Sequence, residues 1–382
     1  MHTLQFSTAS CLRWPYPTGS TTRSGGNDDS TIPRRHAAIR GRCHEASAMS
    51  AVLTEPDRPG VNAERKNRSG WRKLTTTYRI EMAMFAALLV LSTVLTLLEP
   101  RFLSSGNLQN ILSQVMVLGI IAIGQTLVIL TGGIDLSVGG IAAISIMTGG
   151  LVMTQNGVVA GVAVMLATGL LAGTINGVLV AYVRLAPFIV TLGMMSITAS
   201  LAYVISDGRS LFGLPAEFGW LGKGNIGGIK IYVVIFVVLY VVAHLMLTRS
   251  KPGRFLYAIG SNSEAARLSG IRVSAYQVLP YALTGLLCAV AMAIEASRLG
   301  TIDPNTGSGF ELTTIAAVVI GGASLMGGKG SAIGTLIGIF LIGVLQNGLN
   351  IVGVSAFWQG TALGTVIIMA VVLDRVVRGK KA

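Results

Sequence analysis

Long apolar runs dominate this chain, and one basic segment divides them. Of the 382 residues, 52% are hydrophobic and only 12% are charged, whereas soluble domains carry roughly a quarter charged residues. Several runs approach the length of about 20 residues that a helix needs to cross the hydrocarbon core of a bilayer. Because hydrocarbon offers no partner to exposed backbone groups, such runs form helices. We therefore predict an all-α polytopic membrane protein.

Ten runs are predicted to cross the membrane. They cover approximately 80–98, 108–130, a third run ending near 154, 158–182, a fifth ending near 205, 229–247, 280–296, the short run 312–325, 333–352 and 361–373. The segment 249–280 contains five arginines and lysines, and an excess of cations marks cytoplasmic loops. Six crossings from a cytoplasmic N-terminus bring the chain to this segment, and ten leave the C-terminus in the cytoplasm as well.

The regions outside the runs are basic and polar. Residues 1–78 lack a sustained apolar run and are predicted to be a disordered tail. One explanation of this tail is that translation starts near Met49, and we expect residues before Met49 to be dispensable. The membrane domain is predicted over 79–376 with a cytoplasmic loop at 249–277, and 377–382 form a basic cytoplasmic tail. The net charge of +13 thus follows from topology and not from nucleic-acid binding.

A conspicuous polar interruption is TGGIDLSVGG, residues 131–140. Asp135 is the only acidic residue between Leu108 and Tyr203, and an ionisable residue at membrane depth marks a functional site by default. The flanking glycine pairs suit a helix break that lines a cavity. The structural alternative is that Asp135 caps a helix beginning near Leu136. The candidates for the translocation pathway or the helix break are Asp135, Gly132, Gly133, Asn176 and Asn347.

A second glycine-rich segment, 321–331, looks similar because a glycine pair again follows an apolar run. By our count both segments follow crossings in the same direction, which does not fit an inverted repeat. A miscounted helix and a coincidence both remain open. The segment is not a phosphate-binding loop, because Gly330 separates Lys329 from Ser331. We therefore expect no cofactor in this chain, and any ATP has to be bound by another subunit.

Cysteine, histidine and acidic residues argue against several function classes. The three cysteines lack disulfide or metal-ligand spacing, and three of the four histidines precede residue 49. An intramembrane enzyme needs a nucleophile with a base in reach, and no such pair is evident, so neither a metal nor a catalytic residue is predicted. A secondary, ion-coupled transporter is the alternative function, but it usually has several intramembrane carboxylates, whereas Asp135 and Glu295 are few and far apart.

Residues 263–270 of the basic segment are predicted to form a short helix. Ser263 can cap its start, Glu264 favours its first turn and Gly270 can close its end. The segment resembles the EAA-type coupling loop of ATP-driven importer permeases, which implies that this helix docks on the ATP-hydrolysing subunit. The coupling residues implied are Glu264, Ala265, Ala266, Arg267 and Gly270. The alternative is a solvated basic loop that only sets the topology.

Four stretches together carry a wider resemblance. They are GQTLVILTGGIDLSVGGIAAIS, NGVLVAYVRLAPFIVTLGM, GRFLYAIGSNSEAARLSGI and AAVVIGGASLMGGKGSAIGTLIGI. They are similar to the permease subunit of bacterial ABC sugar importers of the ribose, xylose, galactose and autoinducer-2 type. The resemblance covers about residues 80–375 and implies a type II importer permease.

This resemblance also implies where the protein acts and with what. It places the chain as a homodimer in the lipid of the bacterial inner membrane. A periplasmic solute-binding protein and a cytoplasmic ABC ATP-binding subunit are the implied partners. The resemblance implies a small polar solute such as a monosaccharide, but it does not indicate which one.

Overall fold

The computed structural model describes residues 79–355, 358–365, 368–369 and 372, all within one compact unit, Arg68–Ala382. The predicted tails 1–78 and 377–382, with Met49, and part of the tenth span lie outside the described residues. The elements are α2 (Arg79–Leu98), η1 (Pro100–Leu103), α3 (Ser105–Leu130), α4 (Val138–Asn156), α5 (Val158–Ala181), α6 (Pro187–Ser206), η2 (Ala216–Phe218), α7 (Gly219–Lys223), β1 (Asn225–Ile226), β2 (Ile229–Lys230), α8 (Ile231–Arg249), α9 (Lys251–Ser261), α10 (Ser263–Leu268), α11 (Val273–Leu299), α12 (Phe310–Ile320) and α13 (Ala332–Ile351).

Eight of the described helices are long and apolar enough to cross a membrane. They are α2, α3, α4, α5, α6, α8, α11 and α13. Each corresponds to one of the predicted spans, so the polytopic all-α prediction is confirmed. The short antiparallel pair β1 and β2 is the one sheet assigned within the described ranges.

The eighth predicted span is shorter than a full crossing. Its helix, α12, has 11 residues and is therefore about 16 Å long, roughly half of the hydrocarbon thickness. The chain reaches its start through a loop that enters between the helices. In this loop Ile302 exchanges backbone hydrogen bonds of 2.8 and 3.0 Å with Leu211, and Gly307 lies against Gly139 near the start of α4.

The seventh predicted span begins earlier than expected. α11 starts at Val273 and continues through Pro280, where we had placed the first residue of the span. A proline inside a membrane helix removes one backbone bond, which neighbouring helices tolerate. As a result, the predicted loop 249–277 is largely helical, formed by α9, α10 and the first turn of α11.

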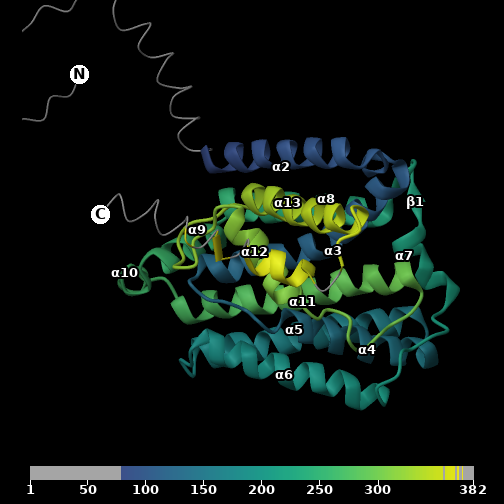
Figure 1. Ribbon diagram of the computed structural model, residues 1–382. Helices are drawn as coiled ribbons and strands as arrows, with labels where there is room; N and C mark the ends of the chain where they lie inside the picture. Colours follow the sequence, from purple (N-terminus) through teal and green to yellow (C-terminus); the bar gives the residue numbers. More distant parts are fainter. Residues whose placement is uncertain (1–78, 356–357, 366–367, 370–371, 373–382) are drawn as a thin grey trace, which may run out of the picture. The chain divides into compact units, whose positions relative to one another are not determined.

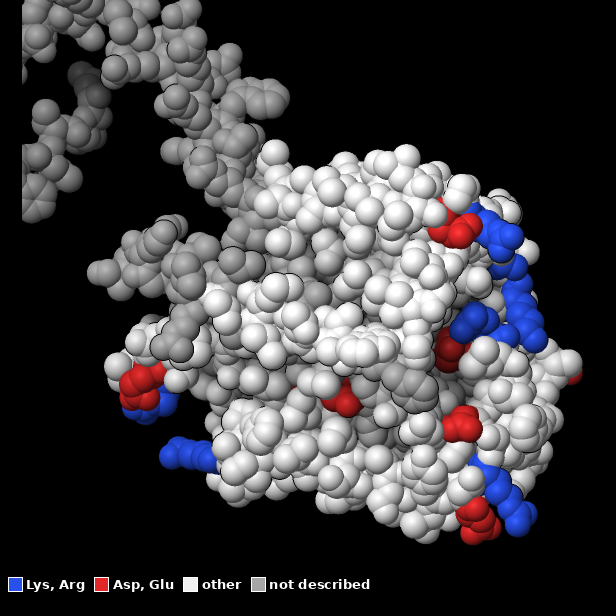
Figure 2. Space-filling model, viewed as in Figure 1, with Lys and Arg blue, Asp and Glu red and all other residues white. Residues whose placement is uncertain are grey.

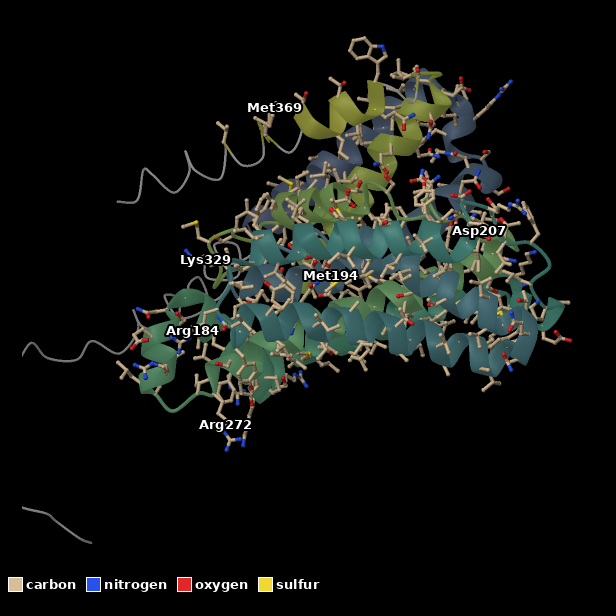
Figure 3. All side chains as sticks on the ribbon, turned by 90° about the horizontal axis from the view of Figure 1, so that it is seen from below. Arg184, Met194, Asp207, Arg272, Lys329 and Met369 are labelled. Atoms are coloured by element: carbon tan, nitrogen blue, oxygen red, sulfur yellow. The ribbon has the colours of Figure 1, made fainter. Side chains whose placement is uncertain are left out.

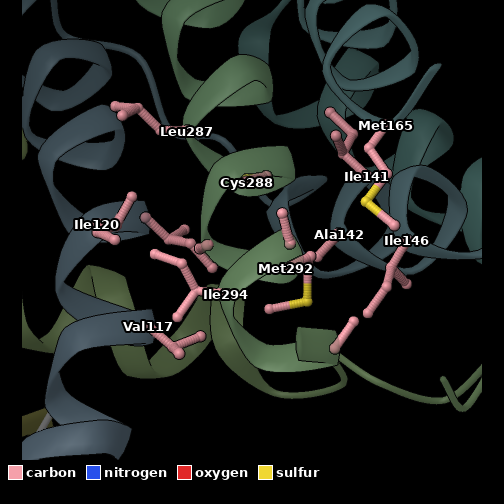
Figure 4. Close-up of a cluster of buried hydrophobic side chains, with 14 of the residues drawn as sticks. Val117, Ile120, Ile141, Ala142, Ile146, Met165, Leu287, Cys288, Met292 and Ile294 are labelled. Carbon is pink, nitrogen blue, oxygen red and sulfur yellow. The ribbon is translucent and has the colours of Figure 1, made fainter. Parts of the chain in front are cut away.

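The core lies around α3 and α11. Side chains of several helices meet in one buried cluster, part of which Figure 4 shows, and which includes Ile120 of α3, Ile141 of α4, Met165 of α5 and Met292 of α11. α2 and α6 lie at opposite edges of the helix assembly in Figure 1. Accordingly, 89% of the membrane-crossing window of α3 is buried against 6% of that of α2.

Glycines allow α5 and α11 to approach closely. Gly169, Gly173 and Gly177 recur every fourth residue and therefore share one face of α5. A Cβ atom at Gly169 would overlap the carbonyl oxygen of Gly285, and one at Gly173 would overlap that of Tyr281. Small residues at this spacing bring membrane helices together, because backbones can then make direct van der Waals contact.

Charged side chains mark the two ends of the helices. Figure 2 shows them gathered mainly at these ends, with a surface that is almost entirely uncharged between them. Arg184, Arg272 and Lys329 lie at the end where α9 and α10 are found, and Asp207 lies at the other, as Figure 3 shows. We call these the α10 end and the Asp207 end.

Candidate functional site

The two glycine-rich segments lie side by side at the α10 end. α3 ends at Leu130, and the backbone N–H of Gly328 donates to the Leu130 carbonyl over 2.9 Å. Gly132 has a φ of +81° and Gly327 a φ of +83°, a region that favours glycine. Both segments thus follow helices that end at the same end of the protein, as expected for two crossings in the same direction.

α9 closes over this junction. A Cβ atom at Gly260 would overlap the Leu130 carbonyl and lie 2.5 Å from the Gly328 nitrogen. The Tyr257 hydroxyl donates to the Gly330 carbonyl over 2.7 Å. One helix of the basic segment, α9, therefore contacts both glycine-rich segments.

Asp135 is fully buried in the first break. Its Oδ1 accepts hydrogen bonds from the Ser137 backbone N–H at 2.8 Å and the Ser137 hydroxyl at 2.5 Å. Asn176 of α5 donates to the same hydroxyl over 2.7 Å. The capping alternative is wrong in its detail, because α4 begins at Val138 with Ser137 as N-cap and Asp135 bonds only to Ser137.

The Asp135 network is tightly enclosed. Within the described residues, its second carboxylate oxygen and the Asn176 amide oxygen are buried without a hydrogen-bond partner. No group of three His, Cys, Asp or Glu that could hold a metal occurs in the described part of the chain. Asp135, Gly132 and Gly133 lie in the segment between α3 and α4, and Asn176 of α5 contacts that segment through the Ser137 hydroxyl.

Asn347 does not belong to this group. Its amide and that of Asn107 exchange hydrogen bonds of 2.9 and 2.8 Å. Asn107 lies in the first turn of α3, far along the helix from the break at Leu130. This candidate pathway residue therefore pairs two helices toward the Asp207 end.

A cavity that includes several side-chain amides, the amide-lined cavity, escaped the sequence analysis. Two adjoining hollows of about 360 and 290 Å³ share Leu118, Phe310, Gln346 and Gln359. The smaller also includes Gln114 of α3, Glu295 of α11 and Asn350 of α13. Gln359 donates to Asn350 over 2.6 Å, and Arg298 pairs with Glu295 over 2.8 Å. The missed signal was the recurrence of amides within otherwise apolar helices.

The predicted coupling helix exists as α10, with two corrections. Asn262, not Ser263, caps it by accepting the Ala265 N–H over 2.9 Å. Ala266 is buried against its own chain at 5% exposure, so it is not free to contact a partner. Gly270 has a φ of +82°, in line with its predicted role in closing the helix.

The rest of α10 faces outward. Leu268 is 77% exposed, and sequence analysis had not selected it. Glu264 accepts two hydrogen bonds from the Arg267 guanidinium, one of them over 3.1 Å, and this contact lowers the pKa of the Glu264 carboxyl. The exposed surface of α10 therefore combines an apolar side chain with an ion pair.

Comparison with known proteins finds similarity to transport permeases. The family described as "Branched-chain amino acid transport system / permease component" matches residues 107–373. The ribose import permease protein RbsC of Escherichia coli (strain K12) is 42% identical over 311 residues, covering 80% of this chain and 97% of that protein.

Two further relatives extend this comparison. RbsC of Bacillus subtilis (strain 168) is 43% identical over 298 residues, 77% of this chain and 92% of that protein. The D-allose transport system permease protein AlsC of E. coli (strain K12) is 36% identical over 301 residues, again 77% of this chain and 91% of that protein. No solved structure matches. The chain belongs to this family of polytopic ABC transport permeases, and its relatives include permeases that are named for sugars.

Proposed function

We propose that this chain is the membrane-spanning subunit of an importer that moves a monosaccharide inward, driven by ATP that a separate subunit hydrolyses. The observation that carries the sugar part of the proposal is the cavity toward the Asp207 end. Its side-chain amides offer both donors and acceptors to hydroxyl groups, and the Phe310 ring offers an apolar face. Cavities of about 300–1,000 Å³ with a few placed polar groups are typical ligand sites.

The charge at this cavity also suits a neutral solute. The Arg298 guanidinium binds Glu295 through two nitrogens, at 3.1 and 2.8 Å. The paired charges leave hydrogen bonding by Gln114 and Gln346 as the main polar interaction available to a solute. The sugar permeases among the relatives support the same solute class.

Coupling to ATP is proposed to run through α10 and α9. The α10 end would face the cytoplasm, because the basic segment lies there and cations favour that side. An ATPase docked on Leu268 and its neighbours would act on α9, which contacts both glycine breaks through Gly260 and Tyr257. Glu264, Ala265, Arg267 and Gly270 remain the proposed coupling residues, with Leu268 added. Two permease copies and a solute-binding protein complete the proposed transporter.

The sugar site is tested by ATP-dependent uptake in proteoliposomes that contain the permease, its ATPase and its solute-binding protein. Ribose, fructose and allose, each labelled, are offered in parallel. Gln114→Leu should lower uptake at least about tenfold, because it removes hydrogen bonds that a hydroxyl group needs. Gln109→Leu is the matched control, since Gln109 is an exposed glutamine on the same helix outside the cavity. Equal uptake by both variants would contradict this site.

The coupling surface is tested in the same preparation. Leu268→Glu should reduce ATPase association and uptake together, because a charge replaces apolar contact, while Leu268→Met should retain both. Uptake that needs a proton gradient and proceeds without ATPase would support the secondary transporter instead.

A further inference from the structure

A separate cavity of about 370 Å³ opens at the α10 end. It is remote from the amide-lined cavity and shares none of its lining residues. Four parts of the chain form its wall: the first glycine break, the turn between α5 and α6, α10 and the start of α11. The residues that matter for the argument are Gly133, Arg184, Glu264, Arg267, Ser274 and Tyr281.

Arg184 brings an uncompensated positive charge to this wall. It makes no ion pair or hydrogen bond within the described part of the chain, whereas Glu264 is neutralised by Arg267 over 3.1 Å. The turn that carries it is held by a hydrogen bond of 3.2 Å from the Leu185 N–H to the Leu179 carbonyl. Arg184 has a φ of +62°, a backbone conformation that is uncommon for residues other than glycine. The turn therefore fixes the backbone from which the exposed Arg184 side chain extends beside the cavity.

Two long helices begin at the same wall. α6 has 20 residues and starts at Pro187, and α11 has 27 residues and starts at Val273; neither has a side-chain cap. Pro187 and Ser274 both line the cavity. The backbone N–H groups at a helix start carry partial positive charge and bind anions. The start of α11 thus adds to the attraction of Arg184 for a negative ligand, whereas Pro187 has no N–H and α6 contributes only through its dipole.

Tyr281 supplies an independent indication of a ligand. Its side chain is 1% exposed, its hydroxyl has no hydrogen-bond partner, and a Cβ atom at Gly133 would overlap that hydroxyl. Both residues line the cavity. A buried hydroxyl without a partner is unfavourable until a ligand or water bonds to it.

From these groups we infer that the cavity binds a phosphate group, either of a soluble phosphate compound or of a lipid head group. A guanidinium, a tyrosine residue with an unpartnered hydroxyl and the start of α11 all belong to the wall of this cavity, which suits an anion with several acceptor oxygens. Two acidic residues are nearby: Glu264, which is paired with Arg267, and buried Asp135, which accepts from Ser137. Because α10 forms part of the wall, an occupant would contact the helix to which coupling is assigned under the proposed function.

The test measures binding to the full-length permease alone in nanodiscs, so it does not depend on transport. The probes are radiolabelled inorganic phosphate and a labelled hexose phosphate, with the unphosphorylated hexose as neutral control. Nanodiscs of phosphatidylcholine are compared with discs that also contain phosphatidylglycerol. The variants are Arg184→Asn and Tyr281→Phe. Asparagine removes the charge of Arg184 and also tolerates the positive φ of that position. Arg209→Asn is the matched control, since Arg209 is an exposed arginine that does not line the cavity.

We expect saturable binding of a phosphate probe to the wild type and to Arg209→Asn, weakened at least about tenfold in Arg184→Asn and about fivefold in Tyr281→Phe. Retention of phosphatidylglycerol that depends on Arg184, with weak binding of the soluble probes, would identify the ligand as a lipid. Equal binding by the wild type and Arg184→Asn would overturn the inference. The inference would also be overturned if neither soluble probe bound saturably and lipid retention did not depend on Arg184.

Discussion

At its C-terminal end α3 meets the glycine backbone of other segments, whereas nearer its N-terminus it carries amide side chains that face partners and a cavity. The Leu130 carbonyl is enclosed by Gly260 and Gly328, while Asn107 and Gln114 act through their side chains. Backbone contacts leave no room for substitution, but side-chain contacts can be exchanged or rearranged. The difference indicates a tightly packed junction at the α10 end and a more adaptable site toward the Asp207 end.

Gly260→Val is the most severe test of whether the junction at the α10 end is tightly packed. The added side chain would overlap the Leu130 carbonyl, so α9 would have to leave the junction or the variant would not fold. We expect severe loss of folded protein, measured as monodisperse permease extracted from membranes. Gly193→Val is the matched control, because Gly193 is a glycine of α6 with no atom near its Cβ position. Normal yield of both variants would show that the junction is loosely packed.

The next effect is expected at Asp135. Asp135→Leu would leave the buried Ser137 N–H and hydroxyl without their acceptor, at a cost of about 1–3 kcal/mol for each unsatisfied group. Asp135→Asn keeps an acceptor oxygen and should retain much of the stability and transport activity. Thermal unfolding and uptake are measured on both. Loss of uptake in Asp135→Asn at wild-type abundance would show that the charge itself is required.

A smaller effect is expected for the amide pair toward the Asp207 end. Asn347→Leu removes two hydrogen bonds to Asn107, and interhelical hydrogen bonds in membrane proteins contribute roughly 0.6–2 kcal/mol. The double variant with Asn107→Leu should be less destabilised than the sum of the single variants, because both disrupt one interaction. Additive changes in unfolding free energy would mean that the pair does not couple α3 to α13.

Much of the architecture followed from apolar run length, because a membrane helix has to be long and apolar. The errors arose where tertiary packing overrides local signals. Pro280 reads as a helix start but lies inside α11, and the run from Leu312 is entered by a loop packed on α4, so it does not cross fully.

The candidate sites were less predictable. The Asp135 break was found because a lone carboxylate between glycine pairs is conspicuous in an apolar sequence. The amide-lined cavity brings Gln114, Phe310 and Gln346 together from three helices, and local sequence does not report such distant contacts. Ala266 was predicted to contact a partner, but its side chain is packed inward. Its position in a short helix does not reveal this packing.

Two ion pairs with the same spacing, at opposite ends of the protein, should contribute differently to its stability. Side-chain exposure is 65% for Glu264 and 64% for Arg267, but 16% for Glu295 and 29% for Arg298. Water and salt screen the exposed pair more strongly, so Glu264→Gln should not measurably change thermal stability, whereas Glu295→Gln should lower it on the order of 1 kcal/mol.

The Glu264 pair should also be insensitive to pH near neutrality. Arg267 lowers the pKa of Glu264 through a hydrogen bond and charge attraction. A lowered carboxyl pKa means that the contribution of the pair is present above the ordinary glutamate pKa and is lost only as the pH falls through the lowered value. Thermal unfolding between about pH 6 and 8 should therefore change equally in wild type and Glu264→Gln. A difference that grows within this range would mean that Glu264 titrates near neutrality and that Arg267 is not its effective partner.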